Sequence, residues 1–333
     1  MKDSDSEERG FEGELVAGVD IGGTNTAVGI VGEEGRLLSS ATFPTRDHGS
    51  AGDFVRHLTA TIRQMVDGLA SPARLRGIGM AAPAANWRTG TVENPANLRW
   101  GNVNLVAMVR DEFKLPVSIT NDANAALLGE MSYGLGRGLS NVILITLGTG
   151  LGAGIAVDGA LVQGENGAAG EFGHMTMERD GRQCGCGRRG CAETYVSATG
   201  LRRTVFALLA EQLDESELRR VSYSALTSEN VSAFAAGGDA LAREALAVTG
   251  RYLGRLMANL AAAFDPEAII LGGGLVYAGD LLVEPARRAF MESALKRYTT
   301  SVRILVSPSN EGQMAILGAS RYAWQSGVPA EAS

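Results

Sequence analysis

The chain alternates between short apolar runs and longer stretches with the spacing of an amphipathic helix. In the first part, apolar runs at 15–20, 27–31, 36–41, 75–81 and 116–120 predict strands, because turn-forming residues bound them. The stretches 51–69, 104–113 and 123–131 predict helices. Three strands followed by alternating helices and strands are typical of an α/β sheet.

The same order of elements returns in the second part of the chain. Strands are predicted at 142–146, 153–157, 268–271 and 302–306, and helices at 198–213, 240–264, 286–298 and 312–325. Asp-Ile-Gly-Gly-Thr at 20–24 matches Thr-Leu-Gly-Thr-Gly at 146–150 when one gap is allowed. This weak self-similarity indicates a duplicated α/β unit.

Each part carries a glycine-rich turn between two strands, at 22–24 and at 147–152. A strand and not a helix follows each turn, which distinguishes both from the dinucleotide-binding fingerprint. Backbone N–H groups in such turns bind phosphate oxygens, and Thr24 and Thr149 add hydroxyls. Asp20, just before the first turn, could hold Mg²⁺ directly or through water. Either turn alone is more simply an ordinary hairpin, but the pair, with glycines at 272–274, favours a nucleotide.

All three cysteines of the chain lie close together, at Cys184, Cys186 and Cys191, and His174 precedes them. Three thiolates and one imidazole form a complete tetrahedral set for zinc. The odd cysteine count and the Cys-x-Cys spacing argue against a disulfide, which leaves buried free thiols as the alternative. A site with four protein ligands is closed, so this zinc is predicted to be structural.

Two carboxylates, Glu171 and Glu193, flank the predicted metal loop. Carboxylates held on a rigid loop suit the hydroxyls of a polyol. Taken alone, each is equally well an ordinary surface acid. The pair Asn121-Asp122 stands between a predicted strand and a predicted helix, where it could cap the helix. Equally, Asp122 lies where open α/β sheets place their sites, and could accept a hydroxyl proton.

Composition narrows the functional classes. The 333 residues are enough for two domains, and the net charge of −7 with a pI of about 5.2 does not favour nucleic acid. We find no apolar run long enough for a membrane span and no apolar core of a signal peptide near the start. Free thiols without an export signal indicate the cytoplasm.

Together these motifs resemble the ROK family (repressor, open reading frame, kinase). They are the motifs at 20–24, 121–122 and 147–152, Gly-Glu-Phe-Gly-His at 170–174, and Cys-Gly-Cys-Gly-x-x-Gly-Cys-x-Glu at 184–193. The resemblance runs from about residue 14 to 325. It implies a duplicated hexokinase/actin-like (ribonuclease H-like) fold of two α/β domains around a central cleft, with ATP as donor and a hexose as acceptor.

We expect a disordered tail at 1–12, a smaller N-terminal domain of 13–122 plus about 311–330, and a larger C-terminal domain of 123–310 with the zinc loop 174–193. The resemblance also implies roles for single residues. Asp122 matches the catalytic base, and His174 would bind zinc with one ring nitrogen and a sugar hydroxyl with the other. The remaining sugar-binding positions are Asn97, Asn121, Glu171 and Glu193, and the nucleotide-side positions are Asp20, Gly22, Gly23, Thr24, Thr149, Gly150, Gly273 and Gly274.

Two departures from the family pattern bear on substrate choice. Asn25 stands where many members have lysine, and the loop 81–86 reads Ala-Ala-Pro-Ala-Ala-Asn, with fewer glycines than is usual. The sequence therefore predicts an ATP- and Mg²⁺-dependent 6-kinase for a hexose. Glucose is favoured, while N-acetylmannosamine, N-acetylglucosamine, allose and fructose remain open.

Two other classes of protein are weighed against the kinase. A sugar-responsive repressor needs a helix-turn-helix domain, and only 19 residues precede Asp20. An actin-like ATPase without a sugar site does not need the metal loop. We expect a hexose and ATP as ligands, no nucleic acid or membrane, and a homodimer or higher homo-oligomer, as the family suggests.

Overall fold

The computed structural model describes residues 13–69, 74–95, 98, 100–308 and 311–327. The expected tail at 1–12 and the predicted sugar ligand Asn97 lie outside the described residues. The described chain divides into two compact units. Unit 1 comprises residues up to 137, then 163–168 and the segment from 312 onwards, and unit 2 comprises 138–162 and 169–311.

Unit 1 is built on a five-stranded sheet in the order β3-β2-β1-β4-β7. Strands β1, β2 and β3 are antiparallel, whereas β4 and β7 run parallel to β1. Side chains of β1 alternate between two apolar layers, one with α1 and α2 and the other with α9. The bounds are β1 (Glu14–Ile21), β2 (Asn25–Gly32), β3 (Leu37–Pro44), β4 (Arg74–Ala81), β7 (Val117–Thr120), α1 (Ala51–Asp67), α2 (Leu105–Phe113), α3 (Asp122–Tyr133) and α9 (Glu311–Gly327).

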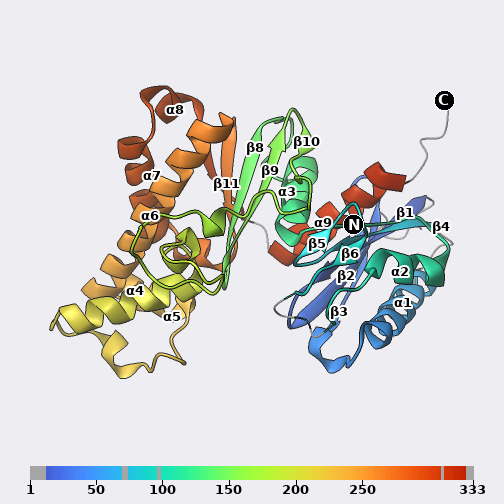
Figure 1. Ribbon diagram of the computed structural model, residues 1–333, viewed down its shortest axis with the longest axis horizontal. Helices are drawn as coiled ribbons and strands as arrows, with labels where there is room; N and C mark the ends of the chain where they lie inside the picture. The colour runs from blue at the N-terminus through green and yellow to red at the C-terminus, as the bar shows by residue number, and fades with distance from the viewer. Residues whose placement is uncertain (1–12, 70–73, 96–97, 99, 309–310, 328–333) are drawn as a thin grey trace, which may run out of the picture. The chain divides into compact units, whose positions relative to one another are not determined.

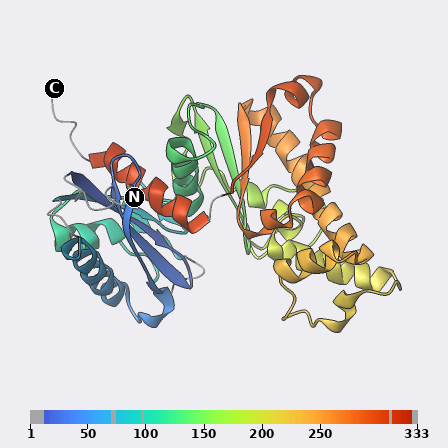
Figure 2. The ribbon, with the colours of Figure 1, turned by 180° about the vertical axis from the view of Figure 1, so that it is seen from behind.

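Helix α9 lies directly on this sheet, as the view from behind shows (Figure 2). A Cβ atom on Gly79 of β4 would come within 1.8 Å of the Ala319 carbonyl oxygen of α9. A Cβ on Gly318 would come equally close to Ala125 of α3. These approaches require glycine, and they join α3 and α9 to the sheet of unit 1. The expected domain break at residue 122 therefore differs from the break between the units, which follows α3.

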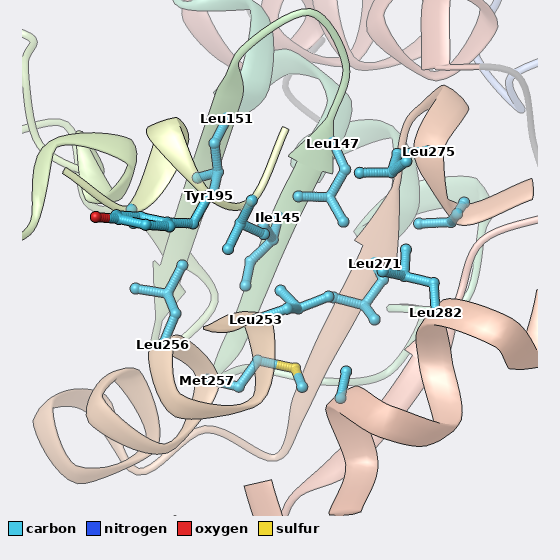
Figure 3. Close-up of a cluster of buried hydrophobic side chains, with 14 of the residues drawn as sticks. Ile145, Leu147, Leu151, Tyr195, Leu253, Leu256, Met257, Leu271, Leu275 and Leu282 are labelled. Atoms are coloured by element: carbon cyan, nitrogen blue, oxygen red, sulfur yellow. The ribbon is translucent and has the colours of Figure 1, made fainter. Parts of the chain in front are cut away.

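Unit 2 repeats the topology of unit 1, with the strand order β10-β9-β8-β11-β12. Again three strands, β8, β9 and β10, are antiparallel, whereas β11 and β12 run parallel to β8. Helix α6 packs along α7 and against this sheet, with Leu253, Leu256 and Met257 meeting Ile145 and Leu271 (Figures 1 and 3). The bounds are β8 (Val142–Leu147), β9 (Leu151–Val157), β10 (Ala160–Leu161), β11 (Ala268–Gly272), β12 (Arg303–Val306), α4 (Ala198–Glu211), α5 (Ser228–Ala236), α6 (Ala240–Phe264), α7 (Asp280–Ser293) and α8 (Lys296–Ser301).

Most of the predicted elements are confirmed, but the helix expected at 286–298 is wrong. The structure has α7 over 280–293 and a separate α8 over 296–301, with Ala294 in an extended conformation between them. Pro285 sits inside α7, although its ring removes a helical hydrogen bond, so the sequence placed the helix start after it. Shorter elements are β5 (Ala85–Asn86), β6 (Thr91–Val92), η1 (Thr45–Asp47), η2 (Phe172–His174), η3 (Ala192–Thr194), η4 (Glu217–Arg220) and η5 (Gly274–Ala278). Among the described helices, none is both long and apolar enough to cross a membrane.

Candidate active site

The glycine turn of unit 1 joins β1 to β2 and is held by the segment that follows β3. Within the turn, Gly22 N–H donates to the Asn25 carbonyl at 3.0 Å. From η1, the Arg46 Nε donates to the Gly23 carbonyl at 2.9 Å, and the Thr45 N–H donates to the Thr24 carbonyl at 2.8 Å. The turn is therefore fixed by two tertiary contacts to its carbonyl groups.

The carboxyl ends of three neighbouring strands bring the predicted residues of unit 1 together. Asp20 of β1 is in register with Ala81 of β4, and Ala81 with Thr120 of β7. Two strand spacings separate the backbones of Asp20 and Thr120 by about 10 Å. Because Asn121 and Asp122 directly follow Thr120, they lie on the same edge of the sheet as the glycine turn.

Asn121 and Asp122 both contact the first turn of α3. Asn121 is the N-cap of α3, and its Oδ1 accepts from the Ala123 N–H at 2.9 Å. Asp122 Oδ1 also accepts from that N–H, at 2.8 Å, so the cap does not depend on the aspartate. Asp122 is exposed, yet the protein around it raises the pKa of its carboxyl by desolvation, against the lowering effect of the Ala123 N–H. An accessible carboxylate with a raised pKa is suited to accept a proton.

The glycine turn of unit 2 joins β8 to β9 and is held by the metal loop. The Leu151 N–H donates to Glu193 Oε2 at 3.0 Å, and the Gly148 N–H donates to the Gly150 carbonyl at 3.1 Å. A Cβ on Gly150 would lie 2.4 Å from the same carboxylate oxygen. Gly150 thus lets the turn close onto Glu193, which connects the turn to the metal loop.

The third glycine run lies against the same turn. Gly273 has a φ of +87°, and a Cβ there would lie 2.6 Å from the Leu147 backbone nitrogen. Gly274 begins η5, which leads to α7. Within unit 2, therefore, the predicted nucleotide-side residues Thr149, Gly150, Gly273 and Gly274 belong to neighbouring turns.

The four predicted metal ligands converge. The donor atoms of His174, Cys184, Cys186 and Cys191 all lie within 4.8 Å of one another. The Cys186 and Cys191 sulfurs are 3.7 Å apart, and so are the Cys184 sulfur and His174 Nδ1. Tetrahedral zinc with bonds of about 2.3 Å to sulfur needs its sulfurs about 3.8 Å apart. The donor set and its spacing fit zinc.

The acidity of the thiols agrees with such a site. The Arg188 backbone N–H and side chain lower the pKa of Cys186 to about 6, so this sulfur is a thiolate at neutral pH. Burial raises the pKa of the Cys191 thiol. A cation is therefore needed to deprotonate Cys191, and metal binding would release protons.

The remaining predicted ligands of unit 2 surround the metal loop. If Nδ1 of His174 faces the cysteines, its Nε2 is left for another partner, and this atom lies 3.9 Å from Glu171 Oε2. Glu171 is exposed, and Glu193 is only partly buried. Glu193 Oε2 is bound to the Leu151 N–H, which leaves Oε1 as an acceptor.

Arg46 is the residue that the sequence did not single out. It lies 23 positions from Gly23, with no recognisable motif between the two. The sequence feature that could have indicated Arg46 is a cation soon after the third strand. The end of that strand pairs with the residue after the first turn, since Pro44 is in register with Asn25.

Comparisons with known proteins agree with this arrangement. A model described as "ROK family" matches residues 16–326. A glucokinase from Halalkalibacterium halodurans is 37% identical over 294 residues, which cover 87% of this chain and 89% of that protein. A solved ROK family glucokinase from Streptomyces griseus, in complex with glucose and AMPPNP, is 33% identical with a TM-score of 0.76, covering 93% of this chain and 99% of that one.

A regulator is also among the similar structures. The solved ROK family transcriptional regulator, a homologue of the E. coli MLC protein, is 27% identical with a TM-score of 0.82. The match covers 93% of this chain but 79% of the regulator.

Proposed function

The chain belongs to the ROK family and has the hexokinase/actin-like fold of its kinases, and we propose that it is an ATP-dependent glucokinase. The reaction transfers the γ-phosphoryl group of ATP to the 6-hydroxyl of glucose. The oxygen of the 6-hydroxyl forms a bond to the γ-phosphorus. The bond from that phosphorus to the oxygen that bridges the β- and γ-phosphates breaks, and ADP leaves.

Asp122 is the proposed general base. Its carboxylate accepts the proton of the 6-hydroxyl as that oxygen attacks. One observation at the start of α3 carries this proposal. Asn121 is the N-cap of the helix, and the neighbouring Asp122 is exposed with a raised pKa. The raised pKa makes this carboxylate a stronger base.

The two glycine turns are the proposed phosphate-binding elements. N–H groups at 22–24 and 148–150 and the hydroxyls of Thr24 and Thr149 would bind phosphate oxygens. Asp20 would hold Mg²⁺, directly or through water, and the ion would supply positive charge to those oxygens. Arg46 positions the first turn through the Gly23 carbonyl and adds positive charge beside it. Gly273 and Gly274 are assigned to the adenosine side.

We propose that the metal loop, residues 174–193, carries part of the sugar site. His174 Nδ1 and the three cysteines would hold structural zinc, leaving His174 Nε2 for a sugar hydroxyl. Glu171 and Glu193 are assigned to further hydroxyls, with Asn97 and Asn121. Glu193 accepts from the Leu151 N–H, so zinc held by this loop would also steady the phosphate turn. Such thiolate ligands need a reducing compartment, which agrees with the cytoplasm.

A coupled assay of ADP release tests the proposal. The purified protein with Mg²⁺ and ATP is given glucose, N-acetylmannosamine, N-acetylglucosamine, allose or fructose in separate reactions. We expect the highest kcat/KM with glucose. Light scattering on the same sample tests the expected homodimer or larger assembly. Absence of sugar-dependent ADP release with all five sugars would refute the kinase.

The second candidate function is that of a sugar-responsive regulator, which the structural likeness to the ROK transcriptional regulator favours. A regulator needs to bind the sugar but not to turn it over. Glucose binding without ADP release, together with sequence-specific DNA binding, would establish it in place of the kinase.

A further inference from the structure

A cavity of about 490 Å³ lies within unit 1, beside its edge strand β7. It is bounded by β7, α2, the loop 87–90 and the last turns of α9. All of these elements belong to unit 1. The volume falls in the range of sites for small molecules.

The lining of this cavity is positive. Arg88 and Arg110 both contribute to it, and none of the described residues that line it is acidic. This is unusual in a chain with a net charge of −7. By contrast, the cavity in unit 2 that contains Arg219 and Arg220 is also lined by Glu215, Glu217 and Asp239.

The two arginines are not equally engaged. Arg88 pairs with Glu165 at 2.7 Å, and its guanidinium lies 5.2 Å from the centre of the Trp87 ring. Arg110 has no carboxylate partner within the part of the chain that the structure describes. The acids next to it pair elsewhere, since Asp111 faces Lys114 and Glu112 faces Arg63.

The hydroxyl group of Tyr322 adds a donor to this cavity. The Tyr322 oxygen accepts from Gln163 Nε2 at 3.3 Å, so its own proton is left to donate.

We propose that this cavity binds a small phosphomonoester, at a site separate from the catalytic residues. Guanidinium groups from two elements suit a phosphate dianion, which accepts bidentate hydrogen bonds. Trp87 and the apolar residues Val106 and Val117 then face the organic part of the ligand. The proposal goes beyond the glucokinase assignment, because no step of the reaction involves these residues.

Isothermal titration calorimetry tests the site with glycerol 3-phosphate and with inorganic phosphate. The protein is first saturated with glucose, Mg²⁺ and AMPPNP, so that the catalytic phosphate sites are filled. We expect the phosphomonoester to bind one site per chain, more tightly than inorganic phosphate does. Arg110→Gln should weaken it roughly tenfold or more, because a charge-assisted contact is lost. Tyr322→Phe should weaken it several-fold.

Arg36→Gln is the matched control, since it removes an exposed arginine elsewhere in unit 1 and should leave binding unchanged. Three results would overturn the proposal: no binding to the saturated protein, equal binding by wild type and Arg110→Gln, or tighter binding of inorganic phosphate than of the ester. The variant comparison does not depend on kinase activity, so it decides the matter even if the glucokinase assignment fails.

Discussion

The two glycine turns occupy the same place in two sheets of the same topology, but groups of opposite charge hold them. In unit 1 the cation Arg46 donates to a carbonyl of the turn, at Gly23. In unit 2 the carboxylate of Glu193 accepts from the Leu151 N–H, just after the turn. The hairpin is thus common to both units, and the segments added to each copy support its turn in different ways.

The same contrast holds at the ends of the last strands. In unit 1, β7 leads to Asn121 and the accessible acid Asp122. In unit 2, β12 leads to Ser307 and Pro308, neither of which can act as a carboxylate base. In the proposed mechanism, unit 1 therefore provides the base and a cation beside its phosphate turn. Unit 2 provides the metal loop.

The largest expected effect follows from replacing Asp122, the acid that has no counterpart directly after β12. Asp122→Asn should lower kcat by roughly 100-fold or more, because the amide cannot accept the hydroxyl proton. The melting temperature should not fall, since Asn121 can supply the cap. The raised pKa means that the ionised carboxylate is less favourable in the folded than in the unfolded protein, so at neutral pH it lowers stability.

Steady-state kinetics and a thermal melt of the same Asp122→Asn sample decide between base and cap. Asp111→Asn, a surface change in the same unit, is the control and should leave both values unchanged. A folded Asp122→Asn protein with near-normal kcat would show that Asp122 is not the base. The difference between the ends of β7 and β12 would then have no part in catalysis.

Breaking the metal loop should have the next largest effect. Cys186→Ser should reduce zinc from about one per chain and raise the KM for glucose at least tenfold, because the ligand that fixes the loop is lost. Metal analysis and steady-state kinetics measure the two changes. In wild type, a chelator should have the same effect, and added zinc should reverse it. A zinc-free native protein with a normal KM contradicts the assigned role of unit 2.

Arg46→Gln tests the support of the first turn and should have a smaller effect. Loss of the guanidinium should raise the KM for ATP by roughly 3- to 10-fold, with a smaller change in the KM for glucose. Initial rates over a range of ATP concentrations measure this, with Arg36→Gln as the control for lost charge. Equal KM values for ATP in wild type and Arg46→Gln would show that the contact of Arg46 with the first turn does not contribute to ATP binding.

The smallest expected effect is a shift in the pH profile. Because desolvation by the surrounding protein raises the pKa of Asp122, the acid limb of kcat/KM should have its midpoint above the ordinary value of 3.8. Activity should fall as the pH drops through that midpoint, since the protonated acid cannot accept a proton. Rates across the acid range in a buffer series measure the shift. A limb at or below 3.8 argues against Asp122 as the group that titrates.

Local features of the site were predictable from sequence because their causes are local. The four metal ligands lie within 18 positions, and both hairpins follow from glycine turns between apolar runs. The environment of Asp122 could not be predicted from sequence. It depends on which side chains accept from the Ala123 N–H and on how far the protein desolvates the carboxyl. Arg46 was missed because its contact with Gly23 arises only from the pairing of β2 and β3.

The start of α7 shows the same limit in the fold. A proline normally marks the first turn of a helix or its end, yet Pro285 lies inside α7 and packs in the buried layer against α6. Tertiary packing overrides the local preference there. The close approaches of α9 to β4 and α3 likewise depend on pairs of residues far apart in the chain, which is why the division after α3 was not foreseen.

The most direct test of the account is the identity of the product. Purified protein with Mg²⁺, ATP and glucose is followed by ³¹P NMR, where the account predicts loss of the γ-phosphate signal of ATP. ADP and one phosphomonoester should appear in equal amounts, the latter coupled to the two protons on carbon 6 of glucose. Unchanged ATP, or release of inorganic phosphate without a sugar phosphate, would contradict the assignment of this chain as a glucokinase.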